Sequence, residues 1–238
     1  MNIEEFKNIF NEECNKNNIK ITNNNIDEFY KYMVEILKWN DKVNLTAIKD
    51  EKEFIIKHFI DSLSISKYIK DSLKIIDIGT GAGFPGIPLK LNNKGLKITL
   101  IDSVNKKLNV IKEISNQMNL DNIEIIHTRA EDLAIKKEYR EKYDIATTRA
   151  VSNLSTTLEY MLPFLKVGGR AICMKGPNYI EELEDSKKAI SILGGKLEKI
   201  ENIEIGDTQR IIIIVSKIKN TPLKYPRGQG KPLKEPIK

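Results

Sequence analysis

Glycines at alternate positions follow a short apolar run and are the strongest chemical signal in the chain. Asp77 lies within the run, and Gly79, Gly81 and Gly83 come after it. An apolar run that breaks into a glycine turn is typical of a buried strand whose backbone approaches a nucleotide cofactor closely. A dinucleotide site needs glycines at the first, third and sixth positions, but the sixth position counted from Gly79 is Phe84. The spacing therefore does not match the ordinary dinucleotide fingerprint.

This spacing resembles the first motif of S-adenosylmethionine (SAM) methyltransferases, with Asp77 able to hold a cationic or hydroxyl-bearing ligand. Asp102 ends the next apolar run, 25 residues after Asp77, where a carboxylate can accept hydrogen bonds from two ribose hydroxyls. The position of Asp102 would suit NAD equally well. We expect Asp77, Gly79, Gly81 and Asp102 to bind a nucleoside cofactor.

Ala130 and Glu131 follow the third apolar run. In SAM-dependent enzymes this turn often supplies a backbone amide and a carboxylate near the adenine edge, so both residues are candidate adenine contacts. Thr128 or Asp132 could instead cap a short helix whatever the ligand.

Arg149 follows the fourth apolar run and is a permanent cation with five donors, suited to a carboxylate or a phosphate. A structural ion pair of Arg149 with Asp102 or Glu131 is the alternative. The chain has only two cysteines, without metal-site spacing, so we predict no metal. Cys173 lies within an apolar run and is expected to be an inert core thiol.

Alternating strand and helix patterns after residue 70 predict the elements that position these residues. A mostly parallel sheet that ends in an antiparallel hairpin is the class I methyltransferase architecture, a Rossmann-like α/β fold. The predicted strands are 73–78, 97–102, 123–127, 143–147, 170–175, 196–205 and 210–216, and the predicted helices are 85–92, 105–118, 153–165 and 178–193. Glycine pairs at 168–169 and 194–195 are predicted turns.

Composition indicates one main domain with appended elements. The chain has 238 residues, of which 40% are hydrophobic. No apolar run approaches the roughly 20 residues of a membrane span, and the start of the chain is unlike a signal peptide, so we expect a soluble cytoplasmic protein. Separately, we expect a monomer. Helical spacing of apolar residues predicts an N-terminal helical cap over 1–70, followed by the SAM-binding domain over 71–218 and a C-terminal arm over 219–238.

The C-terminal arm is basic and rich in proline and glycine. Residues 217–238 hold seven basic residues and one acidic residue, and four of the eight prolines lie there, so we predict neither regular helix nor central strand. The arm is either a solvated, partly disordered terminus or an extended basic arm for RNA in which Tyr225 is available for stacking. In the second case its removal should weaken RNA binding and leave SAM affinity nearly intact.

Several motifs in one order give the chain a family resemblance. They are Asn44-Leu45-Thr46-Ala47, His58-Phe59-Ile60-Asp61-Ser62-Leu63, the extension Gly83-Phe84-Pro85-Gly86-Ile87-Pro88-Leu89, Arg149-Ala150, Lys175-Gly176 and Tyr225-Pro226-Arg227. Together they resemble the bacterial 16S ribosomal RNA guanine-N7 methyltransferase family, also called glucose-inhibited division protein B. The resemblance covers nearly the whole chain. One departure is Thr148, where a serine commonly precedes the Arg-Ala pair.

The resemblance implies SAM as cofactor, 16S ribosomal RNA or the small ribosomal subunit as partner, and nucleotide 527 as target. It implies SAM contacts by Gly79, Phe84, Ala130, Glu131 and Arg149. The residues expected to face the RNA are Arg149, Lys175, Tyr225 and Arg227. Phe84 could line a flipped guanine or the methionine part of SAM.

Guanine N7 carries a free lone pair, so its methylation needs no general base and the chain needs no catalytic residue in that sense. His58, Asp61 and Ser62 therefore need not form a triad. Three other functions remain open at this stage: a SAM-dependent methyltransferase with another RNA or small-molecule acceptor, a nicotinamide oxidoreductase, and a non-catalytic RNA-binding module.

Overall fold

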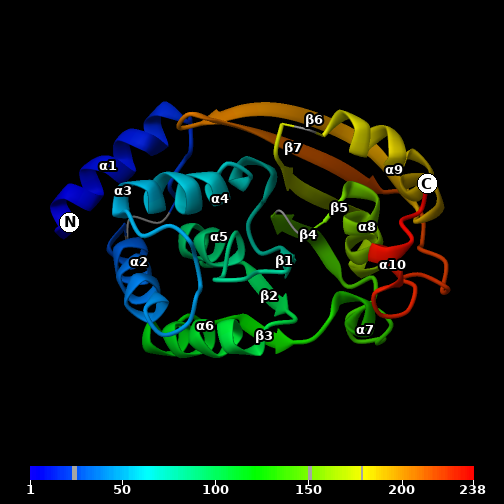
Figure 1. Cartoon of the computed structure of the whole chain (residues 1–238), viewed down its shortest axis with the longest axis horizontal. Helices are drawn as coiled ribbons and strands as arrows, with labels where there is room; N and C mark the ends of the chain where they lie inside the picture. Colours follow the sequence, from blue (N-terminus) through cyan, green and yellow to red (C-terminus); the bar gives the residue numbers. More distant parts are fainter. Residues whose placement is uncertain (23–25, 150–151, 178) are drawn as a thin grey trace.

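A seven-stranded sheet forms the centre of the molecule in the computed structural model, which describes residues 1–22, 26–149, 152–177 and 179–238 (Figure 1). Ala150 of the Arg-Ala pair and residue 178, the predicted start of the last long helix, lie outside the described residues. The strand order is β3-β2-β1-β4-β5-β7-β6, in which β7 runs antiparallel to both of its neighbours. The predicted class I fold, with one antiparallel strand, is confirmed.

The strands lie close to the predicted positions. They are β1 (Lys74–Ile78), β2 (Lys97–Asp102), β3 (Ile123–His127), β4 (Tyr143–Arg149), β5 (Leu165–Lys175), β6 (Gly195–Ile205) and β7 (Thr208–Lys217). The prediction of a turn at 168–169 is wrong, because both glycines lie inside β5, where the pairing with β4 is irregular. A Cβ atom on Gly169 would lie 2.9 Å from the carbonyl oxygen of Asp144, so glycine is required by this close strand contact.

Helices cover both faces of the sheet. The N-terminal ones are α1 (Ile3–Lys16), α2 (Ile26–Asn40), α3 (Glu51–Phe54), the π-helix η1 (Ile55–Ile60), α4 (Asp61–Leu63) and the 3-10 helix η2 (Ser66–Tyr68). The others are α5 (Gly86–Asn92), α6 (Asn105–Gln117), α7 (Ala130–Leu133), α8 (Leu154–Met161), the 3-10 helix η3 (Leu162–Phe164), α9 (Ile180–Ile192) and α10 (Lys231–Lys234). None of the helices in the described ranges is long and apolar enough to cross a membrane.

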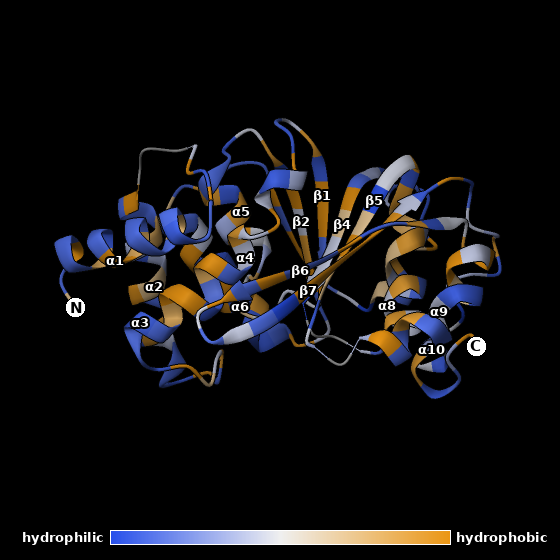
Figure 2. Ribbon diagram, turned by 90° about the horizontal axis from the view of Figure 1, so that it is seen from above, coloured by the Kyte–Doolittle hydropathy of each residue, from blue (hydrophilic) through white to orange (hydrophobic). Residues whose placement is uncertain are grey.

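Two hydrophobic cores lie on opposite faces of the sheet. Ile75 of β1 packs with the N-terminal helices, α5 and α6, whereas Ile76 and Ile78 pack with α7, α8 and α9. This alternation explains why the central strands β1 and β2 are apolar on both faces, and Figure 2 shows them largely orange, whereas the edge strand β6 is mostly exposed.

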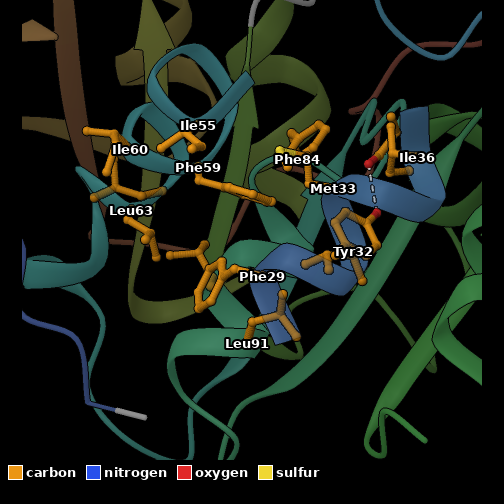
Figure 3. Packing of buried hydrophobic residues seen from close by; sticks show 14 of the residues in the cluster. Phe29, Tyr32, Met33, Ile36, Ile55, Phe59, Ile60, Leu63, Phe84 and Leu91 are labelled. Atoms are coloured by element: carbon orange, nitrogen blue, oxygen red, sulfur yellow. Dashed lines mark hydrogen bonds between the residues drawn. The ribbon is translucent and has the colours of Figure 1, made fainter. Parts of the chain in front are cut away.

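The N-terminal cap (residues 1–70) is held by a cluster of aromatic side chains. Phe59 is fully buried and lies edge-on to Phe29 at a centroid distance of 5.3 Å, and Phe6 and Phe10 pack around it. Phe84 from the glycine turn enters the same cluster, and the Tyr32 hydroxyl donates a hydrogen bond to the Ala82 carbonyl (Figure 3). The cap is thus built directly onto the glycine turn.

The C-terminal segment (residues 219–238) packs on the rest of the molecule, so it is neither the partly disordered terminus nor the extended arm that the sequence left as alternatives. Arg140 donates hydrogen bonds to the carbonyl oxygens of Thr221 and Tyr225, and Ser155 donates one to that of Ile237. The segment also contains α10, contrary to the prediction of no helix. Pro232 lies in the first turn of α10, where proline costs no hydrogen bond.

Candidate active site

The glycine turn is fixed above β2 by backbone hydrogen bonds to one carboxylate. Asp102 accepts from the Gly81 amide through Oδ2 and from the Val104 amide through Oδ1, both at 2.8 Å. Gly79 and Gly81 have φ values of 68° and 58°, in the left-handed region that favours glycine. The turn therefore presents backbone, without side chains, at the carboxyl end of β1.

A cavity of about 230 Å³ opens beside this turn. Its walls come from the ends of β1, β2 and β3, from α8 and from the C-terminal segment. They are Ile78, Gly79, Ile101, Asp102, Ser103, Thr128, Arg129, Ala130, Glu131, Ser152, Tyr160 and Leu233. Gly79, Asp102, Ala130 and Glu131, which the sequence predicted separately, meet here, and we call this space the cofactor cavity.

The cofactor cavity fits a nucleoside. Asp102 offers carboxylate oxygens to hydroxyl groups, and Ile101 with Ala130 offers apolar surface to a purine. A Cβ atom on Gly81 would meet nothing within 4 Å, so there is room for a ligand over the turn. The cavity is smaller than the roughly 300–1,000 Å³ of pockets that enclose a drug-sized ligand, so it matches the nucleoside part of SAM, with the amino-acid part over the glycine turn.

Asp77 supports the turn from below and does not line the cavity. Its side chain is fully buried, and Oδ2 accepts hydrogen bonds from the Thr80 hydroxyl (2.6 Å) and the Gly86 amide (2.9 Å). Burial raises the pKa of Asp77 to about 6, against the hydrogen bonds of Thr80 and Gly86, which lower it. Asp77 Oδ1 is buried and has no hydrogen-bond partner among the described residues.

Glu131 links the cofactor cavity to the C-terminal segment. It is 6% exposed, and its Oε1 accepts a hydrogen bond from the Gly230 amide at 3.0 Å. The helix that begins at Ala130 has no side-chain cap, so the alternative in which Thr128 or Asp132 caps it is wrong.

Phe84 lies in the aromatic cluster of the cap, outside the walls of the cofactor cavity. It is 3% exposed and stacks on the His58 ring at a centroid distance of 4.4 Å. Gly83 is required by this packing, because a Cβ atom there would lie 2.4 Å from the Tyr32 hydroxyl oxygen. The predicted role of Phe84 as a wall for a base or for SAM does not fit this burial.

Arg149 binds the cap. It donates to Asp61 Oδ2 (3.1 Å), to the Lys57 carbonyl (3.0 Å) and to His58 Nδ1 (3.0 Å). The alternative of a structural ion pair is correct in kind but named the wrong partner: Asp61 of the cap, 88 positions earlier in the chain, takes the place of Asp102 or Glu131. Asp61 is 2% exposed and also accepts from Arg210 Nε at 3.2 Å, so it joins two guanidinium groups.

His58 is neutral in this arrangement. Its Nδ1 accepts from Arg149, so its Nε2 carries the proton and donates to the Thr46 hydroxyl oxygen at 2.7 Å. Burial, and then the charge of Arg149, lower the pKa of His58 to about 3. His58 therefore orients Arg149, and the absence of a triad role is in keeping with the sequence analysis.

A second cavity, of about 360 Å³, lies beside Arg149 and His58. We call it the basic cavity because Lys57, Arg149, Lys175 and Arg210 line it, together with Ile48, His58, Asp61, Met174 and Gly176. Lys175 donates to the carbonyl of Ser152, which lines the cofactor cavity, so one hydrogen bond joins a lining residue of each cavity. Arg210 was missed by sequence reasoning, because it stands in an apolar strand pattern with no local motif.

Tyr225 and Arg227 are engaged inside the protein. Tyr225 is 9% exposed, so the expected stacking of its ring on RNA does not fit the structure. Arg227 forms hydrogen bonds of 2.7–3.2 Å to the fully buried carboxylate of Glu159. Cys173 is buried, and burial raises its pKa to about 12, as suits the predicted inert thiol.

The strand order, the glycine turn after β1 and the carboxylate after β2 together define a class I SAM-dependent methyltransferase. Solved structures agree on the fold. They include M. capricolum TrmK in complex with S-adenosyl-homocysteine, with a TM-score of 0.53 and 21% identity, covering 73% of each chain. A SAM-dependent O-methyltransferase from Thermotoga maritima has a TM-score of 0.52 and 14% identity, covering 79% of this chain and 72% of that one.

Sequence relatives give the family. The model of the family described as rRNA small subunit methyltransferase G matches residues 25–212. Ribosomal RNA small subunit methyltransferase G of Alkaliphilus oremlandii is 49% identical over 238 residues, covering 98% of this chain and 100% of that protein. The protein of the same name from Acetivibrio thermocellus is 49% identical over 222 residues, covering 92% and 91%. The chain belongs to the rRNA small subunit methyltransferase G family and is a SAM-dependent enzyme.

Proposed function

We propose that this protein transfers the methyl group of SAM to N7 of a guanine in 16S ribosomal RNA, with the small ribosomal subunit as its partner. Nucleotide 527 is the target that the sequence resemblance implies. The observation that carries the proposal is a pair of cavities at the carboxyl edge of the sheet, one suited to a nucleoside and one basic, with lining residues joined by the Lys175–Ser152 hydrogen bond.

The cofactor cavity supports the placement of SAM. Asp102 would hold the ribose, and Ala130 with Glu131 would face the adenine, while Gly79 and Gly81 leave room for the amino-acid part. Asp77 acts through the turn: its bonds to Thr80 and Gly86 keep the turn in place.

The basic cavity supports RNA as the acceptor. Arg149, Arg210, Lys57 and Lys175 face one space. Both guanidinium groups pair with Asp61, while Lys57 pairs with Glu53 and Lys175 with Glu182. Four cations against three carboxylates leave a net positive charge that attracts a polyanion, and guanidinium groups bind phosphates at fixed geometry. We expect the target guanine to enter unstacked, because N7 lies in the major groove, which is too deep and narrow to reach in an A-form helix.

The proposed reaction requires positioning more than proton transfer. When bound, SAM supplies an electrophilic methyl group on a sulfonium. The lone pair of guanine N7 lies in the ring plane, so no residue has to remove a proton from it. The contribution of the chain is to hold the nucleotide in line, an effect that can supply about 7–11 kcal/mol.

The test is transfer of labelled methyl from SAM to purified small subunits that lack the modification, followed by nucleoside analysis. Label in 7-methylguanosine is expected. Label only in another nucleoside would show that the acceptor assignment is wrong.

The cofactor placement is tested separately with Asp102→Ala. Because hydrogen bonds to a charged group are worth about 1.5–3 kcal/mol each, we expect SAM to bind roughly 10- to 1,000-fold more weakly by calorimetry. Asp132→Ala is the control, since Asp132 is exposed and does not line the cavity. Equal dissociation constants for Asp102→Ala and the unmodified protein would contradict the placement.

We also propose that the protein acts as a monomer, because residues of a single chain line both cavities, and that it acts in the cytoplasm, because its proposed substrate is ribosomal RNA. Sedimentation at assay concentrations is expected to give the mass of one chain.

A further inference from the structure

The C-terminal segment contributes a wall to the cofactor cavity. Leu233 of α10 lines the cavity together with Tyr160 of α8. The Leu233 side chain is 58% exposed, whereas its neighbour Pro232 is buried, so α10 holds Pro232 in the protein and turns Leu233 toward the open cavity. An apolar side chain in this position has surface to bury when a ligand enters.

Anchors on both sides fix the position of Leu233. Before it, Arg227 pairs with the buried carboxylate of Glu159, and the Gly230 amide donates to Glu131. The Pro232 carbonyl accepts from the Thr156 hydroxyl at 2.7 Å, and after it the Ile237 carbonyl accepts from Ser155 at 2.6 Å. Three of these partners lie on α8 and the fourth, Glu131, lies on α7, so these two helices position the part of the segment around Leu233.

The charges of the segment point away from the cavity. Lys231 and Lys234 are exposed and neither lines the cavity, while Gly230 and Leu233 face Glu131 and the cavity. The inner side of this basic stretch is therefore apolar and backbone, which suits the face of a purine.

We propose that residues 228–234 form the wall that closes the adenine end of the SAM site, with Leu233 covering the adenine ring. This inference rests on the proposed placement of SAM in the cofactor cavity. It replaces the expectation that the C-terminal segment serves RNA alone and that its loss leaves SAM affinity nearly intact. Glu131 belongs to the same wall, since its carboxylate holds the Gly230 amide.

The test is calorimetric binding of SAM to the full chain carrying Leu233→Ala. Leu233 is already partly covered, so SAM would bury only part of its side chain, and we expect its removal to weaken binding roughly 3- to 30-fold. Leu223→Ala is the matched control, because Leu223 lies in the same segment, is 87% exposed and does not line the cavity. Its dissociation constant should equal that of the unmodified protein.

Adenosine serves as a second probe, because it carries the adenine without the amino-acid part of SAM. Leu233→Ala should weaken adenosine binding by the same factor as SAM binding. A loss with SAM alone would overturn the assignment of Leu233 to the adenine. An unchanged SAM affinity in Leu233→Ala, with a loss in Asp102→Ala, would overturn the wall while leaving the placement of SAM intact. Unchanged affinity in both variants would overturn the placement itself.

Discussion

The N-terminal cap and the C-terminal segment are both additions to one sheet, and they are attached in opposite ways. The cap joins through an apolar core, in which Phe59 is fully buried and Phe84 enters from the glycine turn. The C-terminal segment adds Tyr225 and Ile237 to the core on the other face of the sheet, and hydrogen bonds to its backbone and the ion pair of Arg227 with the buried Glu159 fix its course.

The difference relates to what each addition does. Apolar burial contributes most of the stability of a domain but is not directional, so the cap is part of the core. Hydrogen bonds contribute less net stability but fix direction, so they can set a short segment against a cavity. The cap borders the basic cavity through His58 and Asp61, whereas the C-terminal segment borders the cofactor cavity through Leu233.

The largest expected effect is on the stability of the cap. Phe59→Ala removes the centre of the aromatic cluster and should lower the free energy of unfolding by about 3–5 kcal/mol, measured by urea denaturation. Val34→Ala is the control, because Val34 lies on α2 of the same cap but is 37% exposed. If the two variants lowered the free energy of unfolding by amounts within about 1 kcal/mol of each other, the aromatic cluster would not be what holds the cap on the sheet.

The next effect separates the two cavities. Arg210→Ala should raise the KM for small subunits roughly 10- to 100-fold, because a charged hydrogen bond to the RNA is lost. The SAM dissociation constant should stay unchanged. This is the reverse of the pattern expected for Leu233→Ala. Arg170→Ala is the control, since Arg170 pairs with Glu198 at the surface. Weaker SAM binding in Arg210→Ala would show that the cavities are not separate sites.

The smallest effect concerns His58 and pH. Its pKa is about 3 in the folded protein and about 6.5 when unfolded, so between these values only the unfolded chain takes up the proton. Stability is therefore lost as the pH falls below 6.5. From pH 7.5 to 5.5, the unmodified protein should lose about 1.4 kcal/mol more than His58→Gln does.

Urea denaturation at the two pH values measures this loss. His127→Gln is the control, because His127 is the only other histidine and is exposed. It should show the same loss as the unmodified protein. If His58→Gln lost as much stability between the two pH values as the unmodified protein does, His58 would not be held neutral beside Arg149.

The sheet was predictable because its signal is local. Apolar runs such as 97–102 and 123–127 are whole strands, and turn residues between them mark their ends. Asp102 and the glycine turn were predictable for a related reason: parallel strands bring their carboxyl ends to one edge, so residues that follow successive strands meet there. The strand Leu165–Lys175 begins five residues before the predicted 170–175. The glycine pair 168–169 indicates a turn by composition, but it lies inside the strand, where the pairing with β4 is irregular.

Side-chain partners were not predictable, because they depend on surfaces that only the folded chain brings together. Arg149 forms a hydrogen bond to Asp61, 88 positions away in the sequence, and Glu131 accepts one from Gly230, 99 positions away. No local pattern indicates that Phe84 points into the cap, or that a segment rich in lysine and proline turns Leu233 toward a nucleoside cavity.

By itself, then, the sequence determined the sheet, the glycine turn, the carboxylate at the end of the second strand and the family, since each follows from residue type and spacing along the chain. Only the tertiary structure decided which cations face one cavity and what closes the other. The physical reason is that burial and pairing depend on the distance between atoms in space, and the two additions to the sheet reach these cavities from opposite ends of the chain.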